Sequence, residues 1–133
     1  MQVHDRRTEE MTRDMDLIRD LLLQIERNPQ MDGHHWVCLT RPEEICTIGK
    51  SLDEVGYHLT LLVDEGFVDG RVGMERMPAI SKLTWKGHEF LDDIRDPGIW
   101  GKTKERLKGL PSVAVAVIAE IAKAEIKKHI GLP

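Results

Sequence analysis

Residues 51–66 read SLDEVGYHLTLLVDEG and predict a helix with both of its ends defined. Ser51, followed three residues later by Glu54, forms a capping box in which each side chain binds the backbone amide of the other residue. Gly66 stands where a left-handed residue ends a helix. The apolar positions between them recur with a period near 3.6 and indicate one buried stripe. They are Leu52, Val55, Leu59, Leu62 and Val63.

Two short β-prone runs follow this helix and flank a polar loop. Phe67-Val68 begins a strand, Asp69-Gly70 has the composition of a turn, and residues 71–78 (RVGMERMP) read as a loop. Ile80–Thr84 then forms the second strand. The pattern predicts a small β-hairpin.

Upstream, apolar residues recur at helical spacing from Thr12 to Asn28, so we expect a helix there, capped by Thr12 or Asp14. A short β-prone run covers Trp36–Leu39. Residues 42–48 (PEEICTI) fit a short helix or a strand, with a slight preference for helix. Residues 1–10 are polar and predict a flexible arm.

Three further helices are expected toward the C-terminus. The first covers Trp85–Arg95 and is capped by Thr84, and the sequence Asp96-Pro97-Gly98 ends it. The second covers Ile99–Lys108. The third covers residues 113–130, where Gly131 ends it.

The order of these elements is helix, short strand, possible helix, helix, strand, loop, strand and then helices. It predicts a mainly α fold with a small β-hairpin, namely a winged helix-turn-helix domain over residues 11–95. A helical extension over residues 96–133 follows this domain.

Composition narrows the functional classes. The chain has 133 residues, of which 41% are hydrophobic and 32% charged, and its net charge is −4, as expected for one soluble globular protein. Two cysteines and no long apolar segment favour a cytoplasmic protein without a membrane contact. Residues 1–100 carry 12 basic and 20 acidic side chains (net −8), whereas residues 101–133 carry 7 and 3 (net +4). Any nucleic-acid contact therefore needs a local basic surface.

Two stretches resemble bacterial winged-helix regulators of the MarR, ArsR and PadR families. EVGYHLTLLVDEGFVDG (residues 54–70) is similar to their recognition helix and first wing strand, and KLTWKGHEFLDDI (residues 82–94) to the second wing strand and the next helix. Together with RDMDLIRDLLLQIE and the C-terminal helix ending in GL, these stretches resemble the bacterial and prophage family known as domain of unknown function 2513. The resemblance implies a winged-helix-like fold and carries no established activity.

We therefore expect a non-enzymatic regulatory module that binds double-stranded DNA. The exposed side of the recognition helix would place Tyr57, His58 and Thr60 nearest the bases. The wing would contact phosphates through its cations, which are Arg71, Arg76 and Lys82. The recognition helix itself carries four carboxylates and no lysine or arginine over residues 51–65, so binding of a basic protein partner is the alternative.

No catalytic residue, cofactor site or metal site is expected. The sequence contains no glycine-rich phosphate loop, nucleophile elbow or zinc-protease motif. His34, His35, Cys38 and Cys46 are the one cluster of metal-binding residue types, and their spacing matches no familiar zinc site. The three tryptophans are expected to anchor the core or the contacts between helices. They are Trp36, Trp85 and Trp100.

The last helix predicts a homodimer. It carries two apolar ridges, which is more than one helix needs to pack on its own small domain. The expected interface residues are Val117, Ile118, Ile121, Ala122 and Ile126.

Overall fold

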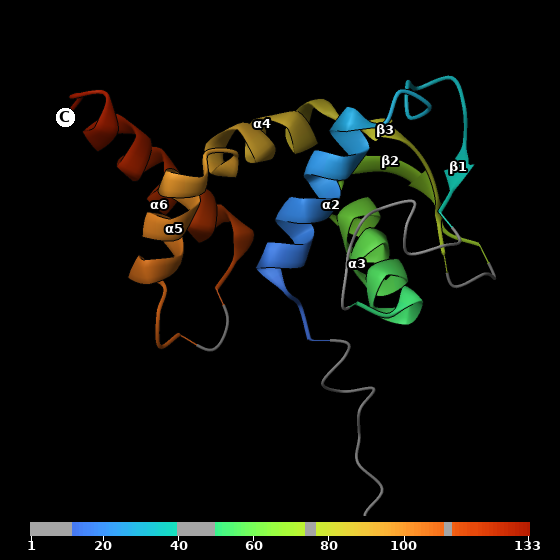
Figure 1. Cartoon of the computed structure of the whole chain (residues 1–133), viewed down its shortest axis with the longest axis horizontal. Coiled ribbons are helices and arrows are strands. Elements are labelled where there is room, and N and C mark those ends of the chain that lie inside the picture. Colours follow the sequence, from blue (N-terminus) through green and yellow to red (C-terminus); the bar gives the residue numbers. More distant parts are fainter. Residues whose placement is uncertain (1–11, 40–49, 74–76, 111–112) are drawn as a thin grey trace, which may run out of the picture. The chain divides into compact units, whose positions relative to one another are not determined.

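A computed structural model of the chain describes residues 12–39, 50–73, 77–110 and 113–133. The chain divides into two compact units, one ending at Gly87 and the other beginning at His88. As the sequence predicted, the described part is mainly helical with a small antiparallel sheet (Figure 1). The domain borders at residues 10/11 and 95/96 remain predictions.

Helix α2 (Met15–Arg27) begins at Asp14, one of the two predicted caps. The Asp14 carboxylate accepts hydrogen bonds from the amides of Asp16 and Leu17, at 3.0 and 3.3 Å. A carboxylate at this end also suits the positive end of the helix dipole. The helix ends at Asn28, as predicted.

Helix α3 (Leu52–Glu65) has the predicted ends. The Ser51 hydroxyl accepts a hydrogen bond from the Glu54 amide at 3.0 Å. Gly66 ends the helix with a φ of 82°, a left-handed conformation that glycine adopts without steric cost.

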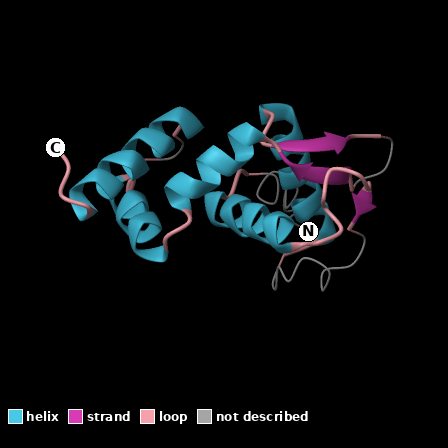
Figure 2. Ribbon diagram, turned by 90° about the horizontal axis from the view of Figure 1, so that it is seen from above, coloured by secondary structure: helices cyan, strands magenta, loops and turns pink. Residues whose placement is uncertain are grey.

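Three strands form an antiparallel sheet in the order β1-β3-β2 (Figure 2). They are β1 (Val37–Cys38), β2 (Val68–Arg71) and β3 (Ala79–Leu83). Val68 lies opposite Leu83, which confirms the predicted hairpin pairing. The short run around Val37 supplies the third strand by pairing with β3.

The predicted turn at Asp69-Gly70 is wrong, because β2 continues through both residues to Arg71. The strand register shifts between Asp69 and Gly70, which marks a bulge rather than a chain reversal. A Cβ on Gly70 would lie 2.6 Å from Cγ2 of Val63. The glycine is therefore needed for close packing of β2 on α3.

The core of the first unit lies between α2, α3 and the sheet. Leu59 is fully buried on α3, as predicted, whereas Leu52 of the same predicted stripe is 38% exposed. The Leu59 side chain belongs to a set of apolar residues that exclude solvent. The set includes Leu17, Leu21, Leu22, Ile25, Leu62 and Ile80.

Helix α4 (Trp85–Ile94) begins at Thr84, the predicted cap. The Thr84 hydroxyl accepts a hydrogen bond from the Gly87 amide at 3.1 Å and donates one to the Gly66 carbonyl. One side chain thus connects the end of α3 to the start of α4. Trp85 is 81% exposed, so its predicted role as a core anchor is wrong. The helix instead buries Gly87 against the backbone of Phe67.

In the second unit, α5 (Pro97–Arg106) begins two residues earlier than predicted. The Asp96 carboxylate accepts a hydrogen bond from the Ile99 amide at 2.9 Å, and Pro97 follows in the first turn. Proline is favoured there because it lacks an amide hydrogen that would have no helical partner. Trp100 is buried, as predicted.

Helix α6 (Val115–His129) packs against α5. Gly131 follows it with a φ of 78°, and the Leu132 amide donates to the Lys127 carbonyl at 2.7 Å. The predicted glycine stop is therefore confirmed. No helix among the described residues is long and apolar enough to cross a membrane.

Several predictions lie outside the described residues. They are the flexible arm over residues 1–10, the ambiguous segment 42–48, the thiol of Cys46 and the wing residue Arg76.

Candidate nucleic-acid interface

The outer side of α3 presents carboxylates. Residues 51–65 carry four acidic side chains and no lysine or arginine. Tyr57 is 36% exposed and is available to a partner, as predicted. Thr60 is half-buried, and its hydroxyl donates to the Gly56 carbonyl at 3.0 Å. DNA phosphates would be repelled by this helix.

His58 is not at the surface, so its predicted place near the bases is wrong. Its side chain is fully buried, and Nε2 accepts a hydrogen bond from the Asp14 amide at 2.8 Å. Nδ1 lies 2.8 Å from the Glu54 carbonyl and donates to it in the tautomer that this arrangement requires. The imidazole therefore connects α3 to Asp14, the N-cap of α2, and has a structural role.

Lys50 adds an ion pair to this junction. Its Nζ donates to Asp14 Oδ2 at 2.9 Å and lies 3.9 Å from Glu54 Oε2. Burial raises the pKa of the Asp14 carboxyl. The hydrogen bond from Lys50, the hydrogen bond from the Leu17 amide and the Lys50 charge lower this pKa by more than burial raises it. The net pKa of Asp14 therefore lies below its ordinary value.

Arg71 and Trp36 form an exposed cation–aromatic pair on the sheet. The Arg71 guanidinium carbon lies 4.2 Å from the centroid of the Trp36 ring, within the range of a cation–π contact. Arg71 ends β2 and Trp36 precedes β1, so the arginine reaches past β3, which lies between these strands. Trp36 is 42% exposed and is not the core anchor that we predicted.

Lys82 lies on the neighbouring part of β3. It is exposed opposite Asp69 of β2, and Val37 pairs with Ile80, which places Trp36 near Lys82 along the strands. Within the described ranges, neither Arg71 nor Lys82 has an ion-pair partner within 4.0 Å. We call Trp36, Arg71 and Lys82 the sheet cluster.

Lys86, a further cation near the wing, is already paired with Glu65. Its Nζ donates to the Glu65 carbonyl at 2.9 Å and lies 3.3 Å from Glu65 Oε1. It also lies 5.1 Å from the centroid of the Phe67 ring. Lys86 therefore neutralises the end of α3 and adds little to a phosphate site.

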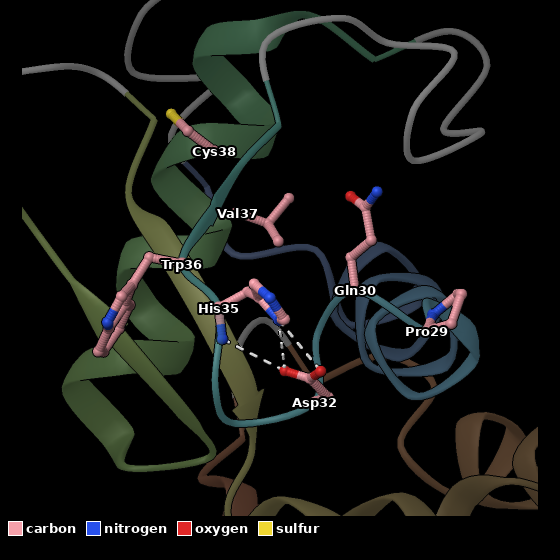
Figure 3. Close-up of a pocket in the computed structure, with 7 residues that line it drawn as sticks. All are labelled: Pro29, Gln30, Asp32, His35, Trp36, Val37 and Cys38. Atoms are coloured by element: carbon pink, nitrogen blue, oxygen red, sulfur yellow. Dashed lines mark hydrogen bonds and ion pairs between the residues drawn. The ribbon is translucent and has the colours of Figure 1, made fainter.

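A pocket of about 500 Å³ lies beside the sheet cluster (Figure 3). In it, the Asp32 carboxylate accepts from the His34 amide at 2.8 Å, and His35 Nδ1 lies 3.1 Å from both Asp32 oxygens. The His34 hydrogen bond and the His35 ring lower the pKa of Asp32 to about 2. The Trp36 indole points away from Pro29 and Gln30.

This pocket lacks the residues of a metal centre. No group of three histidine, cysteine or acidic side chains within the described part of the chain could hold a metal ion. Cys38, which lines the pocket, donates to the Met77 carbonyl at 3.4 Å. The Asp32 carboxylate organises the loop that leads to Trp36.

The predicted dimer residues divide into two groups. Ile118 and Ala122 are buried within the second unit, so their predicted exposure to a partner is wrong. Glu125 of the same helix is also buried and accepts a hydrogen bond from Arg106 Nη1 at 2.9 Å, which lowers its pKa. By contrast, Val117 is 46% exposed. Ile121 and Ile126 are half-buried.

Trp36 is the residue of the sheet cluster that sequence reasoning missed. All three tryptophans look alike as large apolar residues, and nothing in the sequence shows that Arg71 lies over this one. The available signal was its position after a polar loop, Asp32–His35, at the start of a very short strand.

Comparison with known proteins gives a family and a distant relative. Residues 12–114 match the family described as "Hypothetical protein (DUF2513)". An uncharacterized protein of Haemophilus influenzae (strain Rd) is 30% identical over 125 residues, which cover 91% of this chain and 100% of that protein. No solved structure matches the chain.

Proposed function

This chain belongs to the DUF2513 family, and we propose that it is a non-enzymatic winged-helix module that binds double-stranded DNA through its sheet rather than through α3. In this proposal the protein acts in the cytoplasm as a transcriptional regulator, like the bacterial winged-helix regulators that residues 54–70 and 82–94 resemble. A homodimer is a separate proposal.

The order of the elements supports the winged-helix part of the proposal. A helix, a strand, a second helix and a hairpin occur in that order, and the first strand pairs with the last one. The predicted segment 42–48, which fits a short helix or a strand, lies outside the described residues.

The single observation that carries the proposal is the sheet cluster. Arg71 and Lys82 are exposed cations without an ion-pair partner among the described residues, so a phosphate could bind them without first displacing a carboxylate. Trp36 holds the Arg71 guanidinium by stacking, which reduces the entropy lost when this arginine binds. The cluster is thus prepared for an anionic backbone.

Charge also sets the expected affinity. The first unit, through Gly87, carries 11 basic and 16 acidic side chains (net −5), and this field opposes the approach of DNA. Two cations can make only a few phosphate contacts. We therefore expect weak, salt-sensitive binding without strong sequence preference.

Fluorescence anisotropy of a labelled duplex at low salt tests this proposal. Arg71→Ala and Lys82→Ala should each weaken binding several-fold, whereas Lys102→Ala, which removes an exposed cation of α5, should not. Trp36→Ala should weaken binding through the loss of its support for Arg71. Equal affinity of the four variants, or no binding by the wild type, would contradict the proposal.

The acidic side of α3 favours a second candidate function, the binding of a basic protein. Tyr57 and Leu52 are exposed there among the carboxylates, and an aromatic residue surrounded by charge is a common centre of a protein interface. Asp64→Lys and Tyr57→Ala should then abolish capture of the partner from nuclease-treated lysate, while Arg71→Ala leaves it unchanged. If the partner is captured from untreated lysate but not from nuclease-treated lysate, the result would favour nucleic acid over a basic protein as the direct partner.

A further inference from the structure

The second unit carries an apolar groove that the proposed DNA contact does not use. The groove has a volume of about 370 Å³ and lies along α6, with Arg106 of α5 at its edge. Its α6 lining is mostly small or apolar. These residues are Ala116, Val117, Glu120, Ile121 and Ala124.

The two apolar ridges of α6 have different roles. The ridge with Ile118 and Ala122 is buried and packs within the unit, where α5 is the neighbouring helix (Figure 1). The ridge with Val117, Ile121 and Ala124 lines the groove instead. Intrachain packing thus accounts for one ridge and leaves the other accessible.

We propose that a second copy of this chain covers the groove, with the two α6 helices antiparallel about a two-fold axis near Ala124, so that Glu120 of one copy faces Lys127 and Lys128 of the other. This inference does not depend on DNA binding. Alanines at positions 116 and 124 allow close approach of another helix. A two-fold arrangement covers the same ridge on both copies at once.

Charge along α6 selects the second copy and the antiparallel direction. Residues 113–121 contain one acidic side chain and no lysine or arginine (net −1), whereas residues 122–130 contain three lysines and one glutamate (net +2). An antiparallel copy places each half opposite the half of opposite sign, and it also opposes the two helix dipoles. A parallel copy would place like charges together.

Sedimentation velocity of the full chain over a concentration series tests the proposal. The wild type should be a dimer at about 100 μM, and Val117→Glu should raise the dissociation constant by at least about tenfold. Val72→Glu is the matched control, since Val72 is 51% exposed on the first unit, and it should leave the dimer intact. A monomeric wild type, or a dimer unaffected by Val117→Glu, would overturn the proposal.

A charge exchange tests the direction without altering the apolar ridge. Glu120→Lys should weaken the dimer at low salt, and adding Lys127→Glu and Lys128→Glu should restore it. Thermal unfolding checks that each variant remains folded. Failure of the exchange to restore a dimer weakened by Glu120→Lys would overturn the antiparallel arrangement. Because this readout involves no DNA, its failure is distinguishable from failure of the proposed function.

Discussion

His58 shows how a single side chain can change role once its partners are known. Its imidazole is fully buried and accepts the Asp14 amide hydrogen at the start of α2. His58→Leu replaces the imidazole with an apolar side chain and leaves this amide without an acceptor. We therefore expect the free energy of unfolding to fall by about 1–3 kcal/mol. Urea unfolding measures the change.

Asp64→Asn is the control for this prediction, because Asp64 is an exposed residue of the same helix. It should change the free energy of unfolding by less than about 0.5 kcal/mol. Similar losses in the two variants would show that the hydrogen bond to α2 is unimportant.

Asp14 should make stability depend on pH. Its pKa in the folded protein lies below the ordinary value of 3.8, so its stabilising effect is present above that value and is lost as the pH falls through the lowered pKa. Asp14→Asn keeps a capping side chain but removes the charge, and it should cost about 0.2–1 kcal/mol at neutral pH.

Thermal unfolding of this variant and the wild type between about pH 7 and pH 2 checks the sign. The difference between the two proteins should shrink toward the acid end. A difference that stays constant or grows in acid would show that the Lys50 contact does not hold the carboxylate ionised.

At the scale of elements, helix α4 gives the sharpest test, because local propensity and packing disagree there. A Cβ on Gly87 would lie 2.0 Å from the Phe67 carbonyl oxygen, whereas a Cβ on Gly101 of α5 would meet nothing within 4 Å. Gly87→Ala should therefore destabilise the protein by about 1–3 kcal/mol. Gly101→Ala should stabilise it by about 0.5–1 kcal/mol.

Calorimetry of both variants distinguishes packing from propensity. Two stabilised variants would mean that α4 does not approach Phe67 as closely as the structure shows. Two destabilised variants would mean that Gly101 is also in a crowded position.

The elements were predictable where the signal is local. The caps at Ser51, Thr84 and Gly66 depend on a few neighbouring residues, and each is found where the sequence places it. The bulge at Gly70 was not predictable in the same way. The close approach of Val63 and Ile80, which leaves no room for a Cβ at this position, is not revealed by a turn-like dipeptide.

At the scale of the whole molecule, the functional surface was harder to predict than the fold. The sequence identified Arg71 and Lys82 as exposed cations, but the stacking of Arg71 on Trp36 depends on strand order. Likewise, helical periodicity showed two ridges on α6 and could not determine that Ile118 faces its own chain. Contacts between distant segments decide both cases.

The salt dependence of duplex binding tests the central claim most directly, because each phosphate contact adds a fixed amount to its slope. The logarithm of the binding constant should fall linearly with the logarithm of salt concentration, and Arg71→Ala/Lys82→Ala should reduce the slope by roughly 2. Lys102→Ala/Lys127→Ala, which removes the same charge from the second unit, should leave the slope unchanged. Equal slopes for the sheet-cluster variant and the wild type would contradict the proposed interface.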